Sequence, residues 1–202
     1  RTTAQRAPWT GPTAFRAGNM GASEETLEQL EAAEILIDSS YTFCYAGGQC
    51  RFIPEEPYNG SKQYGRVTEL ALSGFRQRRY PGLHPAKPVD LVGISFPECR
   101  QAIKLICGAG ADAVMILHSF SLLKKRDVQY NGGRPNRIVT RRFDRFCNWL
   151  AACELPAYTF SELAQAIADD TYEACHVPPC RLTHPRAVVR KAVQAWNNLY
   201  WT

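Results

Sequence analysis

The feature that most constrains the fold of this chain is a helix followed by a short, uniformly apolar strand, a unit that occurs twice. In the first unit, Ser23 and the two glutamates after it predict a helix start, because a hydroxyl caps the open amides and carboxylates favour the positive end of the helix dipole. The apolar run 35–37 follows and stops at Asp38. A run without polar alternation is typical of a strand buried on both faces.

The second unit has the same order. Ser95 predicts the start of a helix, which Gly108 and Gly110 close. The apolar run 113–117 follows this helix and stops at His118. Two helix-to-strand units with buried strands predict an α/β fold, in which mostly parallel strands form a sheet or barrel covered by helices.

Between the two units the chain is rich in glycine, proline and tyrosine, with one predicted strand at 67–72. The stretch 45–65 is too long for an ordinary connector, and we expect it to form part of a binding wall. Three helices are predicted further along, and they cover 139–153, the residues after Thr159, and 189–200. We therefore predict one domain over 1–170, and a C-terminal helical extension over 171–202.

Composition excludes several classes of protein. The chain has 202 residues, of which 45% are hydrophobic and 21% charged, and this excludes a disordered chain. The net charge of +5 without a dense basic run does not indicate nucleic-acid binding. No apolar run of about 18 residues predicts a transmembrane helix, and the first residues do not resemble a signal peptide. The sequence does not define the oligomeric state.

The eight cysteines also bear on the compartment. Half of them lie in predicted helices among apolar neighbours, where a free cysteine acts as a small hydrophobic residue. These four are Cys99, Cys107, Cys147 and Cys153. Because thiols stay reduced inside cells, the pattern favours a reducing compartment and a cytoplasmic protein.

Three polar side chains lie where a predicted strand ends, namely Arg16, Asp38 and His118. Ligands bind at the carboxyl ends of parallel strands, because the loops there vary over a rigid scaffold. A histidine held by a carboxylate, with an arginine that keeps a carboxylate ionised, suits acid–base hydrolysis. Each also has a structural interpretation: a hydrogen-bonded histidine, a turn-capping aspartate, and an arginine in a surface ion pair.

The chain resembles the polysaccharide deacetylases, the carbohydrate esterases with NodB homology, over about 12–165. Three segments are similar to the third, fourth and fifth motifs of that family in the right order, and they are 15–19 (FRAGN), 35–41 (ILIDSSY) and 115–121 (MILHSFS). Two more resemble its lipopolysaccharide-biosynthesis branch, and they are 67–72 (VTELAL) and 134–137 (RPNR) leading into 141–143 (RRF).

This resemblance implies a distorted, incomplete (β/α) barrel in which a divalent metal, zinc or similar, activates a water that removes an N- or O-acetyl group from a sugar. His118 would be the general acid, Asp38 would orient His118, and Arg16 would pair with the catalytic aspartate. Tyr41 and Phe120 would flank the sugar. Ser39 and Asn19 would also contact the substrate.

The sequence departs from the family pattern before Arg16. The family's first two motifs supply the base aspartate and the Asp, His, His metal ligands, yet the fifteen residues that precede Arg16 contain no Asp, Glu or His. We therefore expect this chain to carry the acid half of a deacetylase site, without a metal site and inactive alone. The alternative is a non-catalytic carbohydrate- or partner-binding remnant of the fold.

Two other groups of residues offer side chains for ligand binding. Cys175, His176, Cys180 and His184 offer zinc ligands for a small interaction module at 170–202, but the spacing matches no zinc pattern, and the two cysteines fit free thiols or a disulfide equally. His84 lies in a turn-like setting and is predicted to be exposed. An arginine group fits either an anionic sugar or lipid headgroup, or a solvated basic face, and it comprises Arg76, Arg78, Arg79, Arg141, Arg142 and Arg145.

Overall fold

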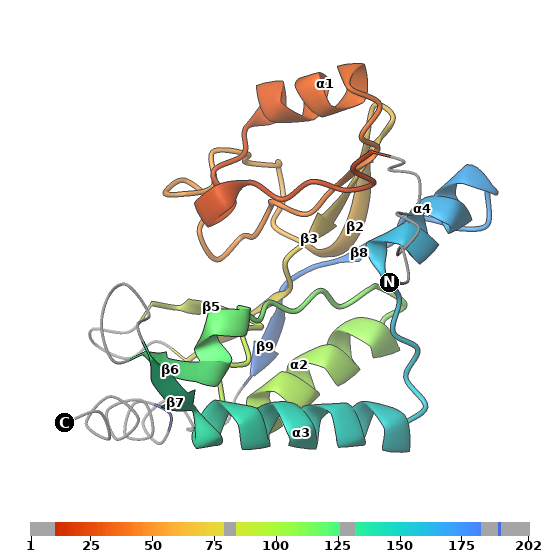
Figure 1. Cartoon of the computed structure of the whole chain (residues 1–202). Helices are drawn as coiled ribbons and strands as arrows, with labels where there is room; N and C mark the ends of the chain where they lie inside the picture. The colour runs from red at the N-terminus through yellow and green to blue at the C-terminus, as the bar shows by residue number, and fades with distance from the viewer. Residues whose placement is uncertain (1–10, 79–83, 126–131, 183–189, 191–202) are drawn as a thin grey trace, which may run out of the picture.

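A computed structural model describes residues 11–78, 84–125, 132–182 and 190 (Figure 1). The α-helices are α1 (Glu24–Ala32), α2 (Phe96–Gly108), α3 (Arg137–Ala152) and α4 (Phe160–Ala168), and the short 3₁₀ helices are η1 (Gly18–Met20) and η2 (Ser119–Leu122). The strands are β1 (Ile37–Asp38), β2 (Asn59–Tyr64), β3 (Val67–Ala71), β4 (Gly74–Gln77), β5 (Ala86–Pro88), β6 (Leu123–Lys125), β7 (Gly133–Pro135), β8 (His176–Val177) and β9 (Cys180–Leu182).

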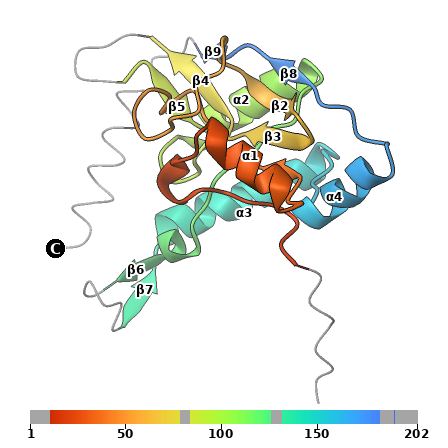
Figure 2. The same ribbon diagram turned by 90° about the horizontal axis from the view of Figure 1, so that it is seen from above.

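The strands form three small sheets. The largest has the order β1-β3-β2-β8, in which β1 and β3 are parallel and the other pairs antiparallel. The second has the order β5-β4-β9, with β4 and β9 parallel, and β6 pairs with β7 in a hairpin beside α3 (Figure 2). Helices and parallel strands are both present, as predicted. The expected mostly parallel sheet is wrong, because four of the six pairings between the named strands are antiparallel, and the sheets of the described residues do not close into a barrel.

The predicted strand at 113–117 forms only two isolated parallel bridges. Val114 bridges to Leu72, and Ile116 bridges to Asp90 on the opposite side. The backbone bonds agree, because Ser73 donates to the Val114 carbonyl at 2.9 Å and Ile116 to the Val89 carbonyl at 3.2 Å. The segment thus passes between two extended neighbours but is too short to form a continuous ladder with either.

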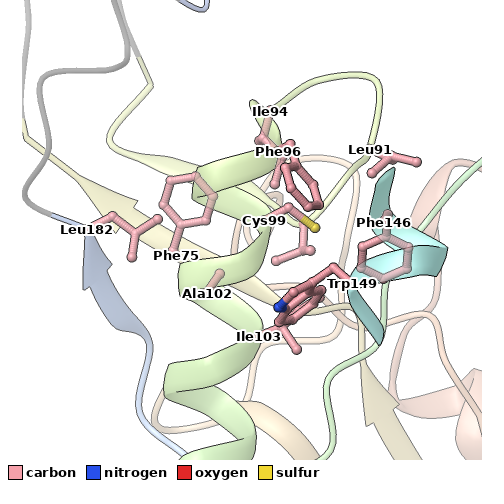
Figure 3. Packing of buried hydrophobic residues seen from close by; sticks show 11 residues of the cluster. Phe75, Leu91, Ile94, Phe96, Cys99, Ala102, Ile103, Phe146, Trp149 and Leu182 are labelled. Atoms are coloured by element: carbon pink, nitrogen blue, oxygen red, sulfur yellow. The ribbon is translucent and has the colours of Figure 1, made fainter. Parts of the chain in front are cut away.

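The main core lies between β4, β9 and the helices α2 and α3. Figure 3 shows Cys99 and Ile103 of α2 facing Phe146 and Trp149 of α3, with Phe75 of β4 on the other side of α2. Burying each of these larger side chains stabilises the fold by about 1.5–3 kcal/mol. A second core under α1 packs its two leucines against the aromatic residues Tyr41, Phe52 and Tyr58.

The helices predicted from capping signals are confirmed. Ser95 accepts a hydrogen bond from the Glu98 amide at the start of α2, and Thr159 accepts one from the Glu162 amide at the start of α4. The amphipathic helix predicted for 139–153 is α3. The helix predicted for 189–200 lies outside the described residues, apart from Arg190.

The predicted loop 45–65 contains a strand that sequence patterning missed. β2 has mostly polar residues, and it pairs with β3 through a two-residue turn in which Gly65 has a φ of +56°. Within β2, Gly60 has a φ of +90°, and a Cβ there would collide with the Cys175 carbonyl oxygen. This close approach, which only glycine permits, is where β8 joins the sheet.

The predicted helical extension over 171–202 is wrong at its beginning. Its first part forms β8, which pairs with β2, and β9, which pairs with β4. The hydroxyl of Tyr172 also contacts Asp112 at 2.6 Å and Ser61 at 2.7 Å. The chain therefore returns to both larger sheets after α4, which local patterning does not reveal.

The cysteine prediction holds only in part. All eight cysteines are free thiols, including Cys175 and Cys180. Cys99 is buried, as expected, but Cys147 on α3 and Cys153 at its C-terminal cap are exposed. Among the described residues, no helix is both long and apolar enough to cross a membrane.

Candidate functional site

Arg16 is held against the end of β1. A parallel bridge places Phe15 beside Asp38, with the Phe15 amide bonded to the Ile37 carbonyl at 2.9 Å. The Arg16 side chain then reaches Ser39, donating from Nε to the carbonyl at 2.8 Å and from Nη2 to Oγ at 2.7 Å. Two bonds from one planar guanidinium fix its orientation.

Asp38 lies beside a second carboxyl group. The parallel register of β1 and β3 makes Glu69 the direct partner of Asp38, and both are almost completely buried, with exposures of 1% and 0%. One oxygen of each carboxyl is hydrogen-bonded: Asp38 Oδ1 accepts from Ser40 Oγ at 2.6 Å, and Glu69 Oε1 accepts from the Tyr41 amide at 2.9 Å. The second oxygens, Asp38 Oδ2 and Glu69 Oε2, are buried and have no hydrogen-bond partner among the other described residues.

Burial raises the pKa of Glu69 well above its ordinary value, and the hydrogen bond and the negative charge of Asp38 raise it further. The raised pKa favours the protonated form of Glu69 beside Asp38. Burial lowers the pKa of Arg16, whereas the two neighbouring carboxyl groups, Glu69 and Asp38, raise it, and a guanidinium stays protonated in proteins.

An aromatic layer covers this acid pair. The ring of Tyr41 stacks on Tyr58 at 4.7 Å and meets Phe52 edge-on at 5.6 Å. Burial raises the pKa of Tyr58, and the nearby Glu69 raises it further, so its hydroxyl stays neutral. Tyr41 is only 1% exposed, so it is a core residue and does not flank an open site as the resemblance implied.

Arg16 is the part of the cluster that reaches the surface. Its guanidinium lies 5.9 Å from the ring centroid of Phe160, at the start of α4. Phe160 is 37% exposed, and Arg16 is half-buried. Asn19 is exposed in η1 with a left-handed φ of 55°. A ligand can therefore touch Arg16 and Phe160, but not Asp38.

His118 is separate from these residues. It precedes η2, and its ring stacks on Phe120, with centroids 4.8 Å apart and an angle of 11° between the planes. Leu72 and Val114 are partners in a parallel bridge and give a common reference point. Asp38 is the partner of Glu69, three residues before Leu72. His118 comes four residues after Val114. The register thus displaces His118 along the strands. No hydrogen bond or ring contact joins His118 to Arg16 or Asp38.

The described residues do not fit the divalent metal that the resemblance implies. Across 11–78, 84–125, 132–182 and 190, no three His, Cys, Asp or Glu side chains are grouped to hold a metal ion. In the Cys/His segment, His176 belongs to β8 and meets Tyr58 edge-on at 5.7 Å, while His184 lies outside the described residues. His84 is exposed, as predicted.

Glu69 is the site residue that sequence reasoning missed. The strand 67–72 was predicted, but Glu69 within it was not assigned to the site. The available signal was the residue type, because a glutamate inside an otherwise buried strand requires a partner.

Comparisons with family models, curated proteins and solved structures found no match for this chain. The function proposed below therefore depends on the geometry of the site and on the motif resemblance.

Proposed function

We propose that this chain contributes to the site of a carbohydrate deacetylase, a hydrolase that removes acetyl groups from sugars of a polysaccharide or lipopolysaccharide precursor, on an incomplete (β/α) barrel. The observation that carries the proposal is the guanidinium of Arg16, fixed on Ser39 beside Asp38 at the ends of adjacent parallel strands. Those three residues belong to two motifs of the resemblance. Their segments lie side by side, as one site requires.

In this proposal Arg16 contacts the ligand, and Asp38 is a positioning residue. Nη1 of Arg16 makes no hydrogen bond with a described residue, so it is available for a sugar oxygen or a carboxylate. The exposed face of Phe160 beside it suits the apolar face of a sugar ring. The buried carboxyl groups of Glu69 and Asp38 raise the pKa of Arg16 and so favour its charged form, while Ser39 fixes the orientation of the guanidinium.

His118 is the general acid of this proposal. Imidazole exchanges a proton near neutral pH, and stacking on Phe120 fixes the plane of the ring. Phe120 is 52% exposed and offers a second surface for a sugar. Because the described residues do not fit a metal, we derive no step through one.

The alternative is a non-catalytic carbohydrate- or partner-binding domain. Two observations favour it: Asp38 is buried away from any ligand, and His118 contacts neither Asp38 nor Arg16. In that case the Arg16–Phe160 surface binds a sugar without hydrolysing it.

The test is acetate release from acetylated oligosaccharides with added zinc, measured on this chain and on any longer natural chain that contains it. We expect release from the longer chain, and at least a tenfold loss on Arg16→Gln, since charged hydrogen bonds contribute about 1.5–3 kcal/mol. Arg66→Gln, at an exposed position of the turn between β2 and β3, is the matched control.

Two outcomes contradict the deacetylase proposal. Oligosaccharide binding by calorimetry without acetate release, lost on Arg16→Gln, identifies the non-catalytic alternative. Equal release by Arg16→Gln and Arg66→Gln removes Arg16 from the site. Circular dichroism of both variants shows whether the fold is retained.

A further inference from the structure

A hollow of about 450 Å³ lies over β4, β5 and the end of β9, and it shares no residue with the cluster around Arg16. Its walls combine cationic side chains with apolar rings, and they include Arg76, Arg78, Arg181, His84, Phe43 and Pro85. We propose that this hollow binds a soluble ligand that carries two linked phosphate groups. The proposal is independent of the deacetylase function.

Two of the arginines are forced together by the sheet. Arg76 of β4 and Arg181 of β9 are direct partners in a parallel register, so their side chains leave the same face. Like charges in this position destabilise a sheet. Neither arginine forms an ion pair with a described residue; the ion pair that is present joins Arg190 to Glu98. A bound anion would offset this repulsion.

One carboxylate lies nearby but does not balance the charge. Glu56 lines an adjoining hollow of about 380 Å³, together with Arg76 and Arg181. Even if Glu56 faces both arginines, one negative charge stands against two positive charges there, and Arg78 adds a third. The described walls of the larger hollow contain no acidic side chain.

Hydrogen bonds on the buried face of β4 fix the strand that carries Arg76 and Arg78. In β4, Phe75 and Gln77 are buried while Arg76 and Arg78 are exposed, as the alternation of a strand requires. Gln77 Nε2 donates to the His84 carbonyl at 2.6 Å, and Gln77 Oε1 accepts from buried Arg190 at 2.6 Å. Such support makes a pre-formed wall rather than a set of free surface side chains.

The chemistry of the walls selects the ligand. A phosphate monoester brings about 1.5 to 2 negative charges, fewer than the three guanidinium groups, and two linked phosphates match them better. Guanidinium forks bind phosphate oxygens in pairs. The ring of Phe43 leaves an apolar surface for the group that the phosphates carry. His84 is oriented by its Nδ1, which lies 3.0 Å from the Ala86 carbonyl, so its other nitrogen is free for the ligand.

The test is calorimetric titration with inorganic pyrophosphate at low ionic strength. Arg76→Gln combined with Arg181→Gln is compared with Arg51→Gln combined with Arg66→Gln, which removes the same charge from exposed positions elsewhere. We expect the wild-type chain to bind, the first variant to lose at least tenfold in affinity, and the second to stay within about twofold. Chemical unfolding of the first variant should show equal or greater stability, because the repulsion is gone.

Three outcomes overturn the proposal. The first is no binding by the wild-type chain at millimolar pyrophosphate, and the second is an equal loss in both double variants, which would show only the effect of net charge. The third is Arg76-dependent binding to phosphatidic acid vesicles without any binding of pyrophosphate. That result would assign the arginines to a lipid surface.

Discussion

Replacing Glu69 by glutamine should abolish a pH dependence of stability that the buried acid pair creates. In the folded chain the pKa of Glu69 is raised by burial and by Asp38, whereas in the unfolded chain it returns to its ordinary value near 4.5. Above that pH the folded state holds one more proton than the unfolded state. The free energy of unfolding therefore falls as pH rises towards the raised pKa, and this contribution is fully present only below about pH 4.5.

The size of the effect follows from proton linkage. One extra proton in the folded state changes the free energy of unfolding by about 1.4 kcal/mol per pH unit between the ordinary and the raised pKa of Glu69. Glutamine keeps the geometry, since its oxygen can accept from the Tyr41 amide and its NH₂ can donate to Asp38 Oδ2. We expect Glu69→Gln to be close to wild type near pH 4.5 and more stable at pH 7.

The assay is urea unfolding followed by circular dichroism at half-unit steps from pH 4.5 to pH 7.5. Taking the difference between wild type and variant cancels the contributions of other groups. Glu28→Gln, on the exposed side of α1, is the control and should leave the wild-type slope unchanged. A wild-type slope that Glu69→Gln does not alter would refute the assignment of the raised pKa to Glu69.

Two further predictions concern stability. Gly60→Ala should lower the free energy of unfolding by about 3 kcal/mol, because φ is +90° and the new Cβ would meet the Cys175 carbonyl. Gly108→Ala, which has open space at the end of α2, should raise it by about 0.5 kcal/mol. Urea unfolding measures both variants, and equal effects would contradict the close approach at Gly60. Glu98→Ala should cost about 3 kcal/mol, since it leaves Arg190 buried without a counter-ion, and a loss below about 1 kcal/mol in the same assay would show that the ion pair contributes little.

Local signals in the sequence predicted the helices because capping and apolar spacing act over a few residues. Ser95 and Thr159 identified two helix starts, and the apolar face of α3 identified its core side. The strand predicted at 35–37 was right only at Ile37, because β1 covers Ile37–Asp38. The helix signals depend on neighbours within a turn or two, which the sequence shows directly.

Features that depend on pairing between distant segments were missed. β2 is polar and has no apolar pattern, and β8 and β9 find their partners more than a hundred residues earlier in the chain. The acid pair was missed for the same reason: Asp38 meets Glu69 only through the register of β1 and β3. Arg16, Asp38 and His118 were predicted to meet at one site, but only Arg16 and Asp38 lie together, and His118 is separate because of the strand register. Ser39 is completely buried and binds Arg16, so it does not contact a substrate as the resemblance implied.

The most direct test of the proposed function is the rate of acetate release after His118→Ala, measured on the longest natural chain that contains these residues. The His118 side chain is exposed and makes no hydrogen bond with a described residue, so its removal should leave the unfolding curve almost unchanged. We predict a loss of at least a hundredfold in acetate release, the usual contribution of general acid catalysis being about 10²–10⁴. Release at the wild-type rate would contradict the role of His118 and, with it, the proposal that this chain supplies the acid of a deacetylase.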